Sequence, residues 1–477
     1  MASIKKNFFY QSLYEILLLS LPLLTSPYIS RVLGAQNLGI YSLSYAVAYY
    51  FQLCCMLGIK YHGTRIIAAV KNNQEELNKR FSELLVLHLF VSLITNLLYI
   101  LYVVLIVKND KLISLIQLLN VFSSLLDISW FYFGIEKFKV TSLTNSLIKI
   151  ISVIFIFLFV KTGNDLWKYT LIISLSFVAS QLVMWLYLKK YTSFVKVNKR
   201  NILEHLKPML ILFFPIVAVS LFRYMDKIVL GFFSTRYQIG LYENADKIIM
   251  IPSTIIISFS TVMLPRITNL NSNGQNNKAL LYTKLSFKYL LLLSIGMAFG
   301  LAAVSDIFSV VFWGDEFVKT GKLIEILSFS IPFTAYSNIL RTQYLMPKKK
   351  DKTYFIAIMV GAIVNIFLNL IFVRKYEAYG VAFATLISEI FVCVLQILMT
   401  RKEFKQNEHI KSFLPFYLSG FIMFFILKLV CKNMTFSIIN LILKILFGFL
   451  IYFIVSSLIL IIQKDEFIIR KLRGVNK

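Results

Sequence analysis

Charged side chains inside long apolar runs are the residues of this 477-residue sequence that could do chemistry. A guanidinium or ammonium group in such a run can hold an anion, and arginine suits phosphate because its fixed donors bond two oxygens while it stays charged. Six cations are therefore candidates for binding a substrate: Arg31, Arg65, Lys149, Arg223, Arg266 and Arg341. A carboxylate in the same setting can carry a proton or a sodium ion, and three acids are candidates for that role: Asp226, Asp246 and Glu389.

Each of these charges also has a structural explanation. Arg223 and Asp226 are three residues apart and Glu243 and Lys247 are four apart, so each pair can meet on one face of a helix. Lys149 lies near the middle of its apolar run, so its side chain is not expected to reach the lipid head groups fully. Anchoring at the head groups is the alternative for three arginines near the ends of apolar runs: Arg31, Arg65 and Arg266.

The composition excludes a soluble protein. Hydrophobic residues make up 58% of the chain and charged residues only 15%, whereas a soluble domain carries about 25% charged residues. A mean hydropathy of +0.74 indicates that much apolar surface must face lipid. The net charge of +27 comes from basic residues in short connections, which we interpret as topology signals and contacts with anionic lipids rather than a nucleic-acid surface.

The elements that must position these charges are membrane-spanning helices. A helix needs about 20 apolar residues to cross the hydrocarbon core, and fourteen such spans are predicted: 8–32, 38–62, 81–107, 112–134, 140–160, 166–188, 206–233, 239–265, 284–313, 322–346, 353–373, 379–400, 412–431 and 436–462. The connections at 189–207 and 348–352 and the C-terminal tail are rich in lysine and arginine. The positive-inside rule therefore predicts that both termini are cytoplasmic.

Weak internal repeats suggest two copies of one unit. Gly39-Ile40-Tyr41 recurs 201 residues later as Gly240-Leu241-Tyr242, and Arg65 meets Arg266 at the same spacing. We predict an all-α polytopic fold of two six-helix bundles related by pseudo-two-fold symmetry, at 1–205 and 206–405. Residues 406–477 would add two further transmembrane helices and a basic cytoplasmic tail.

The sequence predicts neither an enzyme nor a bound cofactor or metal. It contains no G-x-S-x-G, H-E-x-x-H or Walker A motif, and its four cysteines lack the spacing of metal ligands. No outer connection is long enough for the catalytic loop of a membrane polymerase or glycosyltransferase acting on a lipid carrier. A cleft between the two bundles is then the natural path for a transported substrate.

Several motifs resemble bacterial Wzx-type polysaccharide flippases of the MOP superfamily. The resemblance covers most of the chain by topology and is sharpest over about residues 20–70 and 215–270. It rests on these stretches: Pro22-Leu-Leu-Thr-Ser-Pro27-Tyr-Ile-Ser-Arg31-Val-Leu-Gly34, Gly39-Ile-Tyr41, Gly63-Thr64-Arg65-Ile66-Ile67-Ala68, Asp226-Lys227-Ile-Val-Leu230-Gly231, Gly240-Leu-Tyr242-Glu243-Asn-Ala245-Asp246-Lys247 and Pro265-Arg266.

The resemblance implies a flippase that uses alternating access in the bacterial cytoplasmic membrane. Its substrate would be an undecaprenyl-pyrophosphate-linked oligosaccharide, moved from the inner to the outer leaflet for capsule, exopolysaccharide or O-antigen synthesis, and its partners would be membrane lipids and the polysaccharide polymerase machinery. We expect Arg65 and Arg266 to collect the head group, Arg223 and Arg341 to hold it deeper, and Arg31 to assist at release. A proton or sodium gradient would drive transport through the three acids named above. The alternatives are a MATE-like exporter of small molecules and a lipid II flippase.

Overall fold

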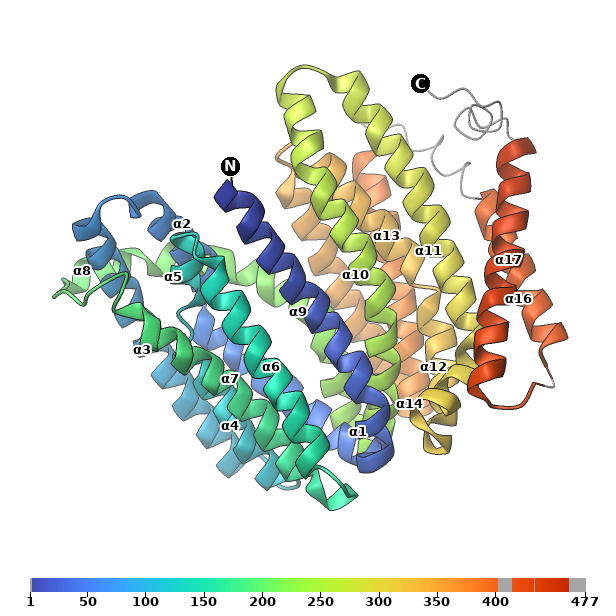
Figure 1. Ribbon diagram of the computed structural model, residues 1–477, viewed down its shortest axis with the longest axis horizontal. Coiled ribbons are helices and arrows are strands. Elements are labelled where there is room, and N and C mark those ends of the chain that lie inside the picture. The colour runs from blue at the N-terminus through green and yellow to red at the C-terminus, as the bar shows by residue number, and fades with distance from the viewer. Residues whose placement is uncertain (1, 402–413, 433, 463–477) are drawn as a thin grey trace. The chain divides into compact units, whose positions relative to one another are not determined.

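The computed structural model describes residues 2–401, 414–432 and 434–462, which form helices and turns without a strand (Figure 1). The predicted all-helical fold is thereby confirmed for this part of the chain. The chain divides into two compact units, Met1–Gly240 and Leu241–Lys477. The predicted boundaries at 205 and 405 stay a prediction, and the basic tail lies outside the described residues.

The first unit begins with helices that pack as a bundle. Helix α4 contacts α1, α3 and α7, while α6 contacts α1 and α7. Short helices α2 and α5 contact each other at one end of the bundle. The helices are α1 (Ala2–Met56), α2 (Ile59–Val70), α3 (Gln74–Leu105), α4 (Lys111–Leu125), α5 (Ser129–Gly134), α6 (Phe138–Phe159), α7 (Leu166–Leu188), α8 (Lys199–Glu204) and α9 (Leu206–Phe233), with the short η1 (Gly163–Asp165) before α7.

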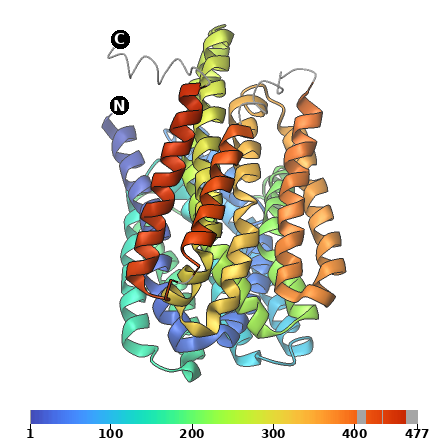
Figure 2. The same ribbon diagram turned by 90° about the vertical axis from the view of Figure 1, so that its right-hand side faces the viewer.

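Helix α10 (Arg236–Ser272) starts in the first unit and continues into the second. In the second unit, α11 contacts α12, α13, α16 and α17. Figures 1 and 2 show these helices in yellow to red from two sides. The remaining elements are α11 (Asn276–Trp313), η2 (Asp315–Phe317), α12 (Val318–Ser328), α13 (Ile331–Leu340), η3 (Arg341–Leu345), α14 (Asp351–Thr400), α16 (Leu414–Val430) and α17 (Ile438–Ile462).

Two long helices are broken inside. In α1 the backbone of Gly34 has φ 75° and ψ 170°, a conformation that glycine adopts without a steric cost. In α14 the break is at Glu377, with φ 47° and ψ −128°. The predicted spans 8–32 and 38–62 lie on the two sides of the first break, and 353–373 and 379–400 on the two sides of the second. Helix α14 therefore contains two of the predicted spans, whereas the span 38–62 continues past the end of α1 into α2.

Eleven helices in the described part of the chain are long and apolar enough to cross a membrane. The broken α1 and α14 each count once among them, and α16, which corresponds to the predicted span 412–431, is shorter. A polytopic membrane fold is confirmed, while the count of fourteen spans stays a prediction.

Two glycines bring the backbones of α1 and the start of α10 into contact. A Cβ atom on Gly39 would lie 1.6 Å from the carbonyl oxygen of Arg236, and one on Gly240 would lie 1.9 Å from that of Ala35. The contact is reciprocal, because Arg236 and Gly240 follow Ala35 and Gly39 by the same 201 residues. A two-fold relation between the predicted copies would produce this kind of self-complementary contact.

Candidate functional site

A polar cavity of about 550 Å³ lies inside the first unit. Its volume falls within the range of pockets that hold drug-sized ligands. Helices α1, α2, α4, α5, α6, α7 and α9 all contribute to its wall, which contains side chains of seven polar types and several aromatic rings. The cavity can therefore hold a hydrophilic group among helices that are largely apolar.

Lys149 of α6 is the cation nearest the middle of a helix in this wall. Its side chain is half-buried, and its Nζ atom lies 4.6 Å from the centre of the Phe177 ring on α7. Among the residues that the structure describes, no carboxylate lies within ion-pairing distance of it. A cation on an aromatic face is partly stabilised, yet its three donors are left for a ligand or water.

Neutral amides and hydroxyls surround this lysine. Asn145 lies one helical turn before Lys149, and Gln181 lies one turn after Phe177 on the facing helix. The Oε1 atom of Gln181 is buried and has no hydrogen-bond partner within the described residues. Because a buried polar atom without a partner is costly, this acceptor indicates a missing donor, such as a ligand hydroxyl or a water molecule.

Asp127 and Lys60 are the other ionisable groups with full charge in the cavity wall. Oδ1 of Asp127 accepts a 2.8 Å hydrogen bond from the backbone N–H of Ser129 at the start of α5. Lys60 is exposed, and its Nζ lies 5.8 Å from the centre of the Phe133 ring. Asp127 thus has a structural role at the start of α5, whereas Lys60 lies at the exposed edge.

A tyrosine cluster continues from the cavity wall. The ring of Tyr49 lies 4.0 Å from that of Tyr224 on α9, centre to centre. The guanidinium carbon of Arg223 lies 5.5 Å from the centre of the Tyr224 ring, and Nζ of Lys227 lies 5.6 Å from it. Arg223 is therefore close to a residue that contacts the wall, although it does not line the cavity itself.

The other candidates of the first unit lie outside the cavity. Arg31 is exposed on α1 shortly before the break at Gly34, and Arg65 is exposed on α2. Arg223 is also exposed, whereas Asp226 is buried, with only 2% of its surface accessible. Of the six cations predicted to bind the substrate, Lys149 alone lines this cavity.

Two candidate arginines of the second unit contact tyrosines. Arg266 is exposed, donates a 2.6 Å hydrogen bond from Nη2 to the Tyr282 hydroxyl, and lies 4.2 Å from the centre of that ring. Arg341 is half-buried and donates from Nη1 to the Tyr354 hydroxyl at 3.1 Å. Arg341 also opens the π-helical segment η3, a distortion that often accompanies function. The shared head-group role of Arg65 and Arg266 stays a prediction.

The candidate acids of the second unit are half-buried, Asp246 on α10 and Glu389 on α14. The predicted pair on α10 is confirmed, because Nζ of Lys247 lies 3.1 Å from Oε1 of Glu243. The predicted ion-carrying roles of Asp226, Asp246 and Glu389 stay predictions.

A buried network in the first unit was not predicted. His62 Nε2 lies 2.9 Å from His205 Nδ1, and His205 Nε2 lies 3.4 Å from Glu83. Glu83 also accepts hydrogen bonds from Asn201 at 3.0 Å and from Arg80 at 2.9 Å. These contacts hold the connection that precedes α9 against α2 and α3. Sequence spacing carried no signal for it, because the histidines are 143 residues apart.

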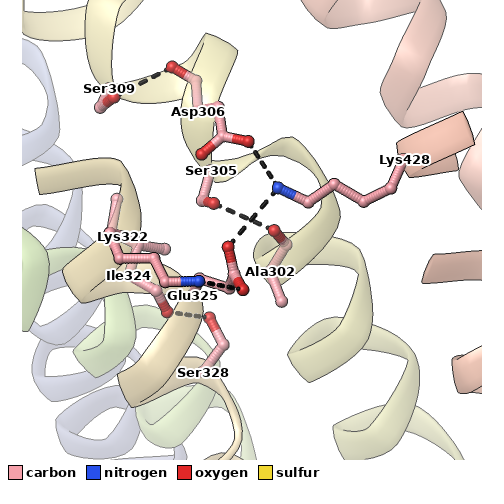
Figure 3. Close-up of polar contacts among 9 residues, drawn as sticks. All are labelled: Ala302, Ser305, Asp306, Ser309, Lys322, Ile324, Glu325, Ser328 and Lys428. Atoms are coloured by element: carbon pink, nitrogen blue, oxygen red, sulfur yellow. Dashed lines mark hydrogen bonds and ion pairs between the residues drawn. The ribbon is translucent and has the colours of Figure 1, made fainter. Parts of the chain in front are cut away.

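An ion-pair cluster in the second unit was also missed. Figure 3 shows the ammonium group of Lys428, on α16, directed at two carboxylates. Its Nζ lies 2.5 Å from Asp306 on α11 and 3.5 Å from Glu325 on α12, and Lys322 lies 2.8 Å from Glu325. The cluster links α16 to the two helices it faces.

This chain is similar to several proteins of polysaccharide synthesis and transport. A family model described as polysaccharide biosynthesis protein matches residues 4–271. Over 385 residues the chain is 26% identical to a protein assigned as an O-antigen transporter in Shigella dysenteriae, which covers 79% of this chain and 94% of that protein. The capsular polysaccharide biosynthesis protein CapF of Staphylococcus aureus is 23% identical over 406 residues, covering 82% of this chain and 97% of CapF.

Two solved structures share the fold. The lipid II flippase MurJ in an inward closed conformation aligns with a TM-score of 0.76 and 21% identity, covering 95% of this chain and 98% of that one. An inward-facing multidrug resistance transporter of the MATE family aligns with a TM-score of 0.60 and 15% identity, covering 83% and 99%. The predicted MOP-type fold is confirmed.

Proposed function

Because this chain belongs to the polysaccharide biosynthesis protein family, we propose that it is a flippase for undecaprenyl-pyrophosphate-linked oligosaccharide repeat units. It would carry them from the inner to the outer leaflet of the bacterial cytoplasmic membrane, for capsule, exopolysaccharide or O-antigen synthesis. Near-full-length similarity to an O-antigen transporter and to CapF supports a lipid-linked glycan as the substrate of a transporter, not of an enzyme. The observation that carries the proposal is the polar cavity inside apolar helices.

The physical task is to move a polar head group through hydrocarbon. An isolated charge in a medium of low dielectric costs on the order of tens of kcal/mol, so a pyrophosphate and its sugars do not cross about 30 Å of hydrocarbon unaided. A hydrated cavity lined by cations and hydrogen-bonding groups removes most of that cost. The polyprenyl chain can meanwhile stay in the lipid.

The position of the cavity supports loading from the cytoplasmic side. Lys60 and Tyr61 of its wall directly precede His62, which is bonded to His205 in the basic connection 189–207. The positive-inside rule predicts that this connection is cytoplasmic. The head group would therefore be taken up from the inner leaflet, and alternating access would release it on the outer side.

The arginines and acids outside the cavity have proposed roles in the same cycle. Arg65 and Arg266 would collect the pyrophosphate, Arg223 and Arg341 would hold it deeper, and Arg31 would assist at release. Asp226, Asp246 and Glu389 would carry the coupling proton or sodium ion. Glycan repeat units delivered to the outer leaflet would then pass to a polysaccharide polymerase.

The proposal is tested by the accessibility of lipid-linked glycan in cells with and without the gene. A glycan-modifying enzyme that cannot cross the membrane is added outside, and the modified fraction of the lipid-linked glycan is measured. We expect modification only in cells that carry the gene, with recovery when it is reintroduced. Equal modification in both strains would contradict the proposal and favour a MATE-like exporter.

Lipid II transport is the alternative with the same mechanism and another cargo. It is separated by expressing the chain in cells depleted of their own lipid II flippase. We expect no rescue of growth by a transporter dedicated to another repeat unit. Full rescue, together with unchanged surface polysaccharide in the deletion strain, would favour lipid II.

A further inference from the structure

The cavity of the first unit places the half-buried ammonium group of Lys149, which has no carboxylate in range among the described residues, beside neutral hydrogen-bonding groups and aromatic rings. Resting on the proposed function, we infer that this cavity binds the glycan part of the substrate and that Lys149 pairs with the carboxylate of an acidic sugar. The repeat unit carried by this protein would therefore contain a uronic acid or another sugar with one carboxylate.

Two helices place the recognition groups around one point. Asn145 and Lys149 lie one turn apart on α6, and Phe177 and Gln181 lie one turn apart on α7, which packs against α6. The 4.6 Å distance between Nζ of Lys149 and the centre of the Phe177 ring fixes where the two faces meet. An anion bound to Lys149 therefore has an aromatic face and two amide side chains beside it.

These neighbours match the chemistry of a sugar. The flat C–H face of a pyranose can lie on an aromatic ring, and its hydroxyl groups can donate to and accept from amides and serines. The partnerless Oε1 of Gln181 needs such a donor. Ser176 and Ser180 add hydroxyls to the wall from the same helix. A purely apolar ligand would leave all of these groups without partners.

The charge of the wall favours a single carboxylate over pyrophosphate. Besides Lys149, the acidic and basic side chains of the wall are the exposed Lys60 and Asp127. A pyrophosphate carries more than one negative charge and is usually held by several cations, while Asp127 would repel it. The single positive charge of Lys149, which faces neutral groups, instead matches the single negative charge of one carboxylate.

An unpaired lysine near the middle of a spanning helix is costly to insert, so such residues mark the path of a ligand or ion. Pairing within the protein would have removed that cost, as it does for Lys428 in the second unit. Lys149 lacks such a partner among the described residues. The ligand itself is then the natural partner.

The test uses the full-length protein reconstituted in liposomes with two carriers that differ in one group. Both are undecaprenyl-pyrophosphate trisaccharides ending in galactose; the middle sugar is glucuronic acid in one and glucose in the other. Galactose oxidase added outside reports the glycan that has crossed. Because the two carriers have the same pyrophosphate, their rate ratio isolates the carboxylate.

We expect the wild type to move the acidic carrier about tenfold faster at low carrier concentration, the effect of one charge-assisted contact. Lys149→Gln should bring the ratio to within about twofold of one, and Lys149→Arg should keep most of it. Lys161→Gln is the matched control, because it removes a lysine of the same region that does not line the cavity and should leave the ratio unchanged.

The ratio of the two transport rates is measured on the wild-type protein, so this part of the test does not depend on whether a variant folds. Movement of both carriers at one rate would overturn the inference while leaving the proposed function in place, and so would a Lys149→Gln protein that keeps the wild-type ratio. Movement of neither carrier would contradict the proposed function itself, and the inference with it.

Discussion

Two lysines, one in each unit, have opposite surroundings for their ammonium groups. Lys149 faces an aromatic ring and neutral amides in a cavity, with no carboxylate in range among the described residues. Lys428 contacts two carboxylates, Asp306 at 2.5 Å and Glu325 at 3.5 Å, and so links α16 to α11 and α12 (Figure 3).

On our proposal, the same side chain serves structure at Lys428 and recognition at Lys149. A cation paired within the protein contributes to helix packing and has little capacity left for a ligand. A cation left unpaired beside a cavity costs stability and gains from a bound anion. Removing the charge of Lys428 should therefore lower the stability of the protein, whereas removing the charge of Lys149 should impair substrate recognition.

The largest effect on stability is expected away from both lysines, at the backbone contact of the first unit. Gly39→Ala would place a methyl group 1.6 Å from the carbonyl oxygen of Arg236, and no side-chain rotation can relieve a clash with backbone. We expect a loss of about 3 kcal/mol or of folding altogether, measured as the yield of monodisperse protein and its unfolding temperature.

Gly300→Ala is the control for that prediction, since the nearest atom to its Cβ is Cε of Met423 at 3.9 Å. It should be neutral or slightly stabilising, because alanine favours helix over glycine by about 1 kcal/mol. Equal effects of the two changes would show that the first unit does not depend on close backbone contact.

A moderate effect is expected for the ion pairs of the second unit. Lys428→Gln should destabilise the protein by about 1–2 kcal/mol, because it leaves two carboxylates without their shared cation. The side chains of Lys428 and Asp306 are 30% and 47% exposed, so solvent screening keeps the value below that of a fully buried pair. A double-mutant cycle with Asp306→Asn should give a coupling energy of about 0.5–1 kcal/mol. A coupling energy of zero would show that the pair has no structural role.

The smallest effect is expected at the cavity amides. Gln181→Leu removes a buried acceptor that has no partner, so it should be neutral or stabilise the protein by up to about 1 kcal/mol while slowing glycan transport. Gln52→Leu is its control, because Nε2 of Gln52 donates to the Asn120 carbonyl at 3.0 Å and its loss should be destabilising. Thermal unfolding and transport are compared for both variants, and destabilisation by Gln181→Leu would mean that its amide is structural.

Much of the fold could be predicted from the sequence, because apolar runs and basic connections indicate the spans and their ends. The repeat of Gly39-Ile40-Tyr41 at Gly240-Leu241-Tyr242 even indicated residues that the structure brings together in the first unit. The breaks at Gly34 and Glu377 lie between adjacent predicted spans.

The site was predicted less completely. Lys149 was selected as a candidate because a lysine in mid-span is rare in any membrane helix, and its role in binding stays a prediction. Its neighbours Phe177 and Gln181 come from another helix and have no distinguishing spacing. The cluster around Lys428 was missed for the same reason, since Asp306 is 122 residues away in the chain. Helices that are apolar on every side show no periodicity that would reveal which face meets which.

The measurement that tests the central claim most directly compares Lys149→Gln with Lys428→Gln in one preparation, by thermal unfolding in detergent and by glycan transport in liposomes. The account predicts that Lys428→Gln lowers the unfolding temperature, whereas Lys149→Gln leaves it unchanged or raised and loses the preference for an acidic glycan. A Lys149→Gln protein that is as destabilised as Lys428→Gln and keeps that preference would contradict the account.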